Sequence, residues 1–119
     1  MENPKVEFLL EGLCPYRETK FKTPPKEDYC VWNDSKNTYG ADNKNLVVEH
    51  NISIELYEYS PNDDLEESIE ARFDDLAIFY DKQERYWLDG EKLFQIVYEF
   101  TYLEKKGVNK QWVELKVYY

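Results

Sequence analysis

Residues 45–59 constrain the fold of this chain more than any other stretch, because apolar and polar side chains alternate along them. The even positions carry Leu46, Val48, His50, Ile52, Ile54 and Leu56, and the odd positions include Glu49, Asn51, Ser53 and Glu55. This period of two places the aliphatic side chains on one face of an extended strand and the polar ones on the other. We therefore expect a long strand at the centre of an antiparallel sheet that is covered on one face.

The length and the charge limit what such a sheet can belong to. A chain of 119 residues fits one domain, which we assign to residues 1–119. Fifteen Lys and Arg against 25 Asp and Glu give a net charge of −10, which opposes binding to nucleic-acid phosphates or anionic lipid. An aromatic content of 17% is too high for a disordered acidic chain. The composition therefore predicts a folded acidic domain that suits a basic partner or a role in which repulsion is useful.

The cysteines and the apolar runs indicate a compartment. Cys14 and Cys30 lack the CxxC spacing of a redox or metal motif, and no secretory leader is recognisable at the start of the sequence. The unbroken apolar runs are too short for a membrane span. We expect an intracellular protein with two free thiols and no membrane association.

The first half of the chain reads as a helix, strands and a loop. Asn3 and Pro4 form a capping pair for a short amphipathic helix that ends near Gly12. Short strands are expected within residues 16–21 and 29–32. Residues 33–45 are dense in Asn, Asp, Ser and Gly, and they predict a loop of about a dozen residues, long enough to be functional or mobile.

A second helix and more strands follow the central strand. Ser60 and Pro61 predict the start of a helix. Residues 78–103 read as a hairpin that turns near Asp89-Gly90, and residues 111–119 read as a strand within a C-terminal extension, 105–119. We therefore predict an α+β fold with a mainly antiparallel sheet of about five or six strands and two helices packed on one face.

The second helix is expected to divide into an apolar stripe and an acidic face. Leu65, Ile69, Phe73 and Leu76 recur at helical spacing and should lie on the sheet. The opposite face carries Glu66, Glu67, Glu70 and Asp74, which we predict to be solvated and to form an acidic surface. Three interpretations of this surface remain open: solubility, mimicry of DNA phosphates, or a surface that lies beside DNA without binding it.

No arrangement of residues indicates a catalyst, a metal site or a cofactor. The single histidine, His50, shares the apolar side of its strand and is expected to be partly buried and hydrogen-bonded, with no acid or amide orienter implied by spacing. The run from Asn33 to Asn37 lacks the Gly and the final acid of a calcium loop. We expect no enzyme activity, no metal and no cofactor.

Several strings along the chain resemble a known family. These are YGADNK at 39–44, IELY at 54–57 before the acidic helix, EKLFQIVYEF at 91–100, and Pro24-Pro25 followed by Tyr29-Cys30-Val31. Together they resemble the tail terminator or tail completion proteins, which join head to tail in long-tailed phages and prophages of Gram-positive bacteria. The resemblance covers residues 6–103, and residues 105–119 extend beyond the family pattern. None of the strings is a catalytic signature.

The resemblance implies a structural role in the virion. Members form a ring, usually hexameric, that caps the tail tube and meets the head connector, while DNA passes nearby without tight binding. By analogy, the oligomer or tube contact would lie in the loop at Asn37, Tyr39, Gly40, Asp42, Asn43 and Lys44. The residues alone keep an alternative open, in which the chain is a small acidic inhibitor that imitates DNA phosphates and captures a basic nuclease or DNA-binding protein.

Overall fold

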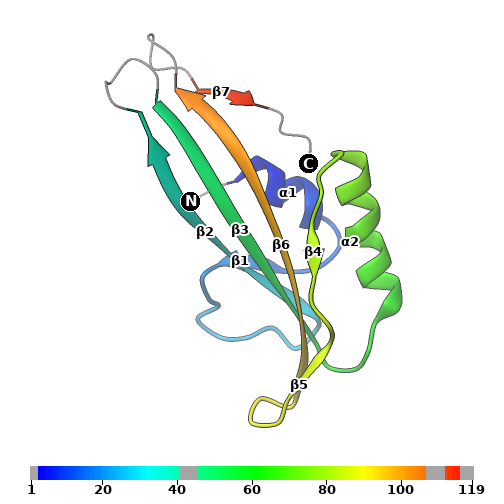
Figure 1. Cartoon of the computed structure of the whole chain (residues 1–119). Coiled ribbons are helices and arrows are strands. Elements are labelled where there is room, and N and C mark those ends of the chain that lie inside the picture. The colour runs from blue at the N-terminus through cyan, green and yellow to red at the C-terminus, as the bar shows by residue number, and fades with distance from the viewer. Residues whose placement is uncertain (1–2, 41–45, 107–111, 116–119) are drawn as a thin grey trace.

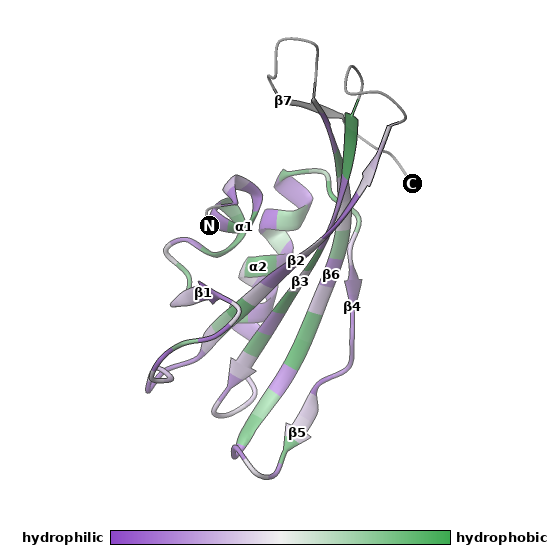
Figure 2. Cartoon of the chain, turned by 90° about the vertical axis from the view of Figure 1, so that its left-hand side faces the viewer, coloured by the Kyte–Doolittle hydropathy of each residue, from purple (hydrophilic) through white to green (hydrophobic). Residues whose placement is uncertain are grey.

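The computed structural model describes residues 3–40, 46–106 and 112–115, with Lys106 and residues 112–115 described as backbone only. It has an α+β fold in which a mostly antiparallel sheet carries two helices, which confirms the predicted fold class. The two helices lie on the same side of the sheet (Figure 2). The described part of the chain measures 48 × 29 × 23 Å along its principal axes. The molecule is therefore elongated along its strands (Figure 1).

The order of the elements follows the sequence expectation closely. The helices are α1 (Pro4–Leu10) and α2 (Asp63–Asp75). The strands are β1 (Tyr16–Glu18), β2 (Tyr29–Tyr39), β3 (Leu46–Glu58), β4 (Asp81–Lys82), β5 (Tyr86–Leu88), β6 (Leu93–Lys106) and β7 (Trp112–Leu115).

The strand β3 is the centre of the sheet, as its alternation predicts. The described strands have the order β1-β2-β3-β6-β4, and β5 and β7 also pair with β6. Every pairing is antiparallel except that of β1 with β2. Along β3, Ile54 faces Trp32 of β2 on one side and Tyr98 of β6 on the other. Three long strands therefore form the body of the sheet.

The predicted loop at 33–45 is wrong over its first part. Residues 33–39 continue β2 and pair with residues 47–53 of β3. Asn, Asp and Ser have low strand propensity, but a long neighbouring strand that satisfies the backbone groups overrides so weak a preference. Residues 41–45, which hold the rest of the predicted loop, lie outside the described residues.

The core lies between the helices and one face of the sheet. Val6, Leu9 and Leu10 of α1 and Ile69 and Phe73 of α2 are fully buried. They pack in one cluster with sheet residues that include Ile52, Ile54, Leu56, Ile96 and Tyr98. This packing confirms that the apolar stripe of α2 faces the sheet.

The helix caps agree with the sequence in one case and differ in the other. Asn3 caps α1, because its side chain accepts from the backbone N–H groups of Lys5 and Val6. For α2 the predicted cap Ser60 is wrong, since Asn62 Oδ1 accepts from Leu65 N at 3.1 Å. Pro61 therefore precedes the helix.

The expected hairpin is present, but its first arm is short. β5 and β6 pair around the Asp89-Gly90 turn, while β4 is a separate two-residue strand farther along β6. Residues 77–85 run along the edge of the sheet next to α2 (Figure 1). No described helix is both long and apolar enough to cross a membrane.

Candidate functional site

Along most of its length, the outer edge of β2 pairs with no strand in the part of the chain that the structure describes. β1 pairs only with Cys30, Val31 and Trp32. Residues 33–39 continue past it, and among the described residues no strand pairs with them on that side. An uncovered edge presents backbone N–H and C=O groups that can pair with another chain. The far ends of β2, β3 and β6 project beyond the helices (Figure 1).

The sheet face opposite the helices is polar and hollowed. A groove of about 860 Å³ crosses β2, β3 and β6 and is bordered by Phe79, whose side chain is 60% exposed. Within it, Thr101 Oγ1 donates to Asn51 Oδ1 at 2.8 Å, and Asn51 Nδ2 donates to the carbonyl oxygen of Ser35 at 3.2 Å. The carboxylates of Glu49 and Glu99 line the same groove.

Two of the predicted contact residues meet on this outer face at Glu49. Asn37 Nδ2 donates to Glu49 Oε1 at 3.1 Å, and Tyr39 Oη donates to the same oxygen at 3.4 Å. These donors, led by Asn37, lower the pKa of Glu49. Gly40 is exposed and follows β2 with φ of 143°, a conformation that favours glycine. The other predicted contacts, Asp42, Asn43 and Lys44, lie outside the described residues.

The predicted acidic surface is correct at two positions and wrong at two. Glu67 and Asp74 are exposed. Glu66 is buried, and Glu70 is partly buried. A single cation, Lys82 Nζ, lies 2.9 Å from Glu66 Oε1 and 2.7 Å from Glu70 Oε2. The two glutamates therefore point into an ion cluster under the 77–85 segment and are not part of a solvated face.

Arg85 completes this cluster and reaches a third buried acid. Its Nη2 atom lies 2.7 Å from Glu66 Oε2 and 2.9 Å from Asp63 Oδ1. Its Nε atom lies 3.4 Å from Oε1 of Glu58, which is fully buried at the end of β3. Two cations thus hold acids of α2 and β3 together.

Glu58 is the most deeply buried acid of the cluster. Neither of its carboxylate oxygens accepts a hydrogen bond from the described residues. Burial first, and then the neighbouring Glu66 carboxylate, raise the pKa of Glu58 to about 8. A neutral Glu58 can donate its proton to Glu66, whereas an ionised one would be a buried anion beside another anion. Burial and the Glu66 carboxylate therefore favour the neutral form of Glu58 near pH 7.

His50 is buried and hydrogen-bonded, as predicted, but both of its partners were missed. His50 Nδ1 lies 2.7 Å from Asp34 Oδ2, and Nε2 lies 2.8 Å from Glu104 Oε1. Its ring stacks on Tyr102 with centroids 4.5 Å apart. Asp34 and Glu104 occupy even positions on the strands that flank His50, so a correct extension of β2 would have placed Asp34 on the same face.

The two contacts of His50 occupy both nitrogens of its ring. With a carboxylate on each ring nitrogen, His50 has no free nitrogen for a substrate. Among the residues that the structure describes, no group of three or more His, Cys, Asp or Glu side chains is placed to hold a metal ion. The three side chains link β2, β3 and β6 diagonally, because Asp34 pairs opposite Ile52 and Glu104 opposite Val48.

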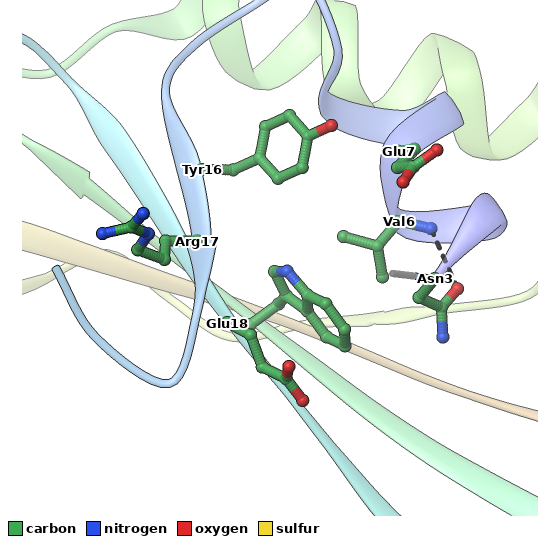
Figure 3. Close-up of a pocket in the computed structure, with 7 residues that line it drawn as sticks. Asn3, Val6, Glu7, Tyr16, Arg17 and Glu18 are labelled. Atoms are coloured by element: carbon green, nitrogen blue, oxygen red, sulfur yellow. Dashed lines mark hydrogen bonds between the residues drawn. The ribbon is translucent and has the colours of Figure 1, made fainter. Parts of the chain in front are cut away.

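A second cavity lies between α1 and the β1–β2 edge (Figure 3). It has a volume of about 470 Å³, with Val6 and Trp32 as apolar lining and Tyr16 beside them. Glu7, Arg17 and Glu18 surround its opening. Among the described residues, its lining holds neither histidine nor cysteine.

Comparison of the sequence with protein-family models gives no match, and comparison with curated proteins gives none.

Proposed function

We propose that this chain is a structural protein of a phage virion, a tail terminator or tail completion subunit that forms a ring, usually hexameric in the family it resembles. The ring would lie at the neck, between the tail tube and the head connector, after assembly in the bacterial cytoplasm. The sequence resemblance supports this role, and one structural observation carries it, which is the uncovered edge of β2 at residues 33–39.

The uncovered edge would serve as one half of a subunit contact. A strand or loop of the next subunit can add to it through backbone hydrogen bonds, and a contact between two different surfaces closes into a ring when the rotation allows. Asn37 and Tyr39 belong to this edge segment, and their side chains would give the contact its specificity. The polar groove beyond them would face the tube or the connector.

The charge of the subunit suits a channel that DNA passes through. The net charge is −10, and Glu67 and Asp74 present exposed carboxylates on α2. Fixed carboxylates repel phosphates, so DNA would pass the ring without adhering to it.

The ring is a better proposal than the phosphate-mimicking inhibitor because two of the acids on α2 are already paired with cations of the same chain. Mimicry requires carboxylates that are free to meet a basic partner. Glu66 and Glu70 are already paired with Lys82, and Glu66 also with Arg85. Only part of the predicted acidic surface therefore remains for a partner.

Assembly on tail tubes tests the proposal. The full-length protein is mixed with purified tail tubes of the phage that encodes it, and bound rings are detected by cosedimentation and electron microscopy. We expect rings at tube ends, and we expect Tyr39→Ala to weaken their formation at least about tenfold, the effect of losing a contact residue worth about 1.4 kcal/mol.

The matched control is Phe8→Ala, which removes another exposed aromatic ring from the helix-covered side of the molecule. This variant should assemble like the parent protein. A protein that stays monomeric in the presence of tubes, or equal loss of assembly in both variants, would contradict the proposed edge contact.

A further inference from the structure

The two cysteines are neighbours in space although they are far apart in sequence. The Sγ atoms of Cys14 and Cys30 lie 3.6 Å apart, and both are free thiols. The parallel pairing of β1 with β2 brings them together, because the backbone N–H of Cys30 donates to the carbonyl oxygen of Pro15 at 2.9 Å. Backbone pairing between β2 and the residues that follow Cys14 therefore holds the two cysteines together.

The two thiols differ in access. Cys30 is completely buried, whereas Cys14 is partly exposed and lines a surface cavity of about 600 Å³. Asp28, Tyr59 and Asn62 also line this cavity, which is a space large enough for a small reagent. A molecule arriving from solvent therefore meets Cys14 first.

The thiols also differ in acidity. Their shared hydrogen bond lowers the pKa of Cys14, although burial and the nearby acids Asp28 and Glu27 oppose this effect. Burial raises the pKa of Cys30. Since the thiolate is the nucleophile, Cys14 is the more reactive of the two.

We propose that Cys14 and Cys30 form a reversible dithiol–disulfide site that reacts with small disulfides through the cavity at Cys14. This site is independent of ring formation. Both sulfur atoms are within reach of each other, one is accessible to the reagent, and the other is shielded from it.

The reaction has two exchange steps. The Cys14 thiolate attacks a disulfide RSSR, which forms the Cys14–SR bond, breaks the S–S bond of the reagent and releases one thiolate. Cys30 then attacks the Cys14 sulfur and passes its proton to the departing sulfur, which forms the Cys14–Cys30 bond, breaks the Cys14–SR bond and releases the second RS group as a thiol. One reagent disulfide is reduced to two thiols, and the two protein thiols are oxidised to one disulfide.

The disulfide would join the end of the α1 region to β2 and close the segment that contains β1. A crosslink of this kind restricts the unfolded chain, so the oxidised protein should melt at a higher temperature than the reduced one.

Redox titration of the full-length protein tests the site. The native protein is equilibrated with mixtures of reduced and oxidised glutathione, quenched with acid, alkylated and measured by intact mass. We expect loss of about 2 Da with no alkylation in oxidising mixtures, and reversal by dithiothreitol. Trypsin should then release residues 6–17 joined to residues 27–36, because Lys5, Arg17, Lys26 and Lys36 supply the cleavage sites.

Single variants establish the order of the two steps. Cys30→Ala should stop at a glutathione adduct on Cys14, whereas Cys14→Ser should stay unmodified while folded. Cys30→Ser repeats the first test with a side chain closer in size to cysteine, and circular dichroism shows which variants fold. Wild-type protein that stays reduced in the most oxidising mixture, a disulfide between two molecules, or equally fast glutathione addition to Cys30 would overturn the proposal.

Discussion

Arg85 Nε lies 3.4 Å from Oε1 of Glu58, and the same guanidinium binds Glu66 at 2.7 Å through Nη2. Both carboxyl groups are buried, whereas the arginine side chain is 30% exposed. The arginine thus reaches inward from the 77–85 segment, where it neutralises the Glu66 carboxylate and lies beside the protonated Glu58 carboxyl group. Two of the chain's elements, β3 and α2, depend on a residue that arrives later in the sequence.

Replacing Arg85 should therefore be costly. Arg85→Gln takes a positive charge away from the buried Glu66 carboxylate, and stranding a buried charged group costs about 2 kcal/mol or more of unfolding free energy. Urea denaturation followed by circular dichroism measures the loss. Lys92→Gln is the matched control, because Lys92 pairs with Asp89 in an exposed position and such a pair contributes at most about 1 kcal/mol. Equal effects in the two variants would contradict the burial argument.

The pH dependence of stability should follow Glu58. Its pKa rises from the ordinary value of 4.5 to about 8 in the folded protein, so the folded state keeps a proton that the unfolded state has lost. A carboxyl group with a raised pKa destabilises the fold as the pH increases through 4.5 toward 8. Glu58→Gln stays neutral at every pH and should melt at least about 4 °C above the parent at pH 8.5.

At pH 3 this difference should become small, because Glu58 is then almost fully protonated in both states of the parent. Melting curves at the two pH values provide the measurement. A Gln variant that is less stable than the parent at the higher pH would show that Glu58 is ionised and stabilising.

His50 should control the stability of the part of the sheet that projects past the helices. His50→Gln removes the imidazole ring whose two nitrogens contact Asp34 and Glu104. Weakening these two contacts should cost about 2 kcal/mol of unfolding free energy. Amide hydrogen exchange should speed up in residues 34–38 and 101–104 more than in Ile54 and Ile96. Ser53→Ala, three residues along β3 on the open face, is the control. Uniform acceleration over the whole sheet would argue against a local link.

Tyr98 offers a test of the α2 contact on its own. Its hydroxyl donates to Glu70 Oε2 at 2.7 Å, and burial raises its pKa. Tyr98→Phe keeps the ring in the core and should cost about 1.5 kcal/mol, the net value of a hydrogen bond to a charged group. Tyr86→Phe removes an exposed hydroxyl and should change stability by less than about 0.5 kcal/mol. Chemical denaturation measures the free energy of unfolding of both variants. Equal stability of Tyr98→Phe and Tyr86→Phe would show that the Tyr98–Glu70 hydrogen bond does not stabilise the fold.

The sequence was most informative where side chains repeat with a fixed period. Alternation along β3 identified the central strand, and the spacing of Ile69 and Phe73 identified the buried face of α2. These features are local, so a period of two or of about 3.6 residues is enough to recognise them. The α+β class followed from the order of such segments.

The failures share a cause, which is that distant partners decide them. Asn33 to Tyr39 look like a loop by composition, yet β3 supplies the backbone partners that make them a strand. Glu66 looks solvated by its charge, yet it lies three residues before Ile69 and is covered by Arg85 and Lys82 from another segment. The three-residue spacing between Glu66 and Ile69 could have predicted that Glu66 lies on the buried side of α2. Nothing in the local sequence indicates that Arg85 contacts Glu66.

The ion cluster at Lys82 and Arg85 also bears on how the protein resists digestion. Trypsin must bind a lysine or arginine side chain in its own acidic pocket, and here those two side chains are already held by glutamates of the same chain. Cleavage after either residue would first require the segment to detach from α2, whereas Lys20 and Lys22 stand exposed near the β1–β2 connection. A protease of similar specificity should therefore cleave after Lys20 and Lys22 before it cleaves after Lys82 and Arg85.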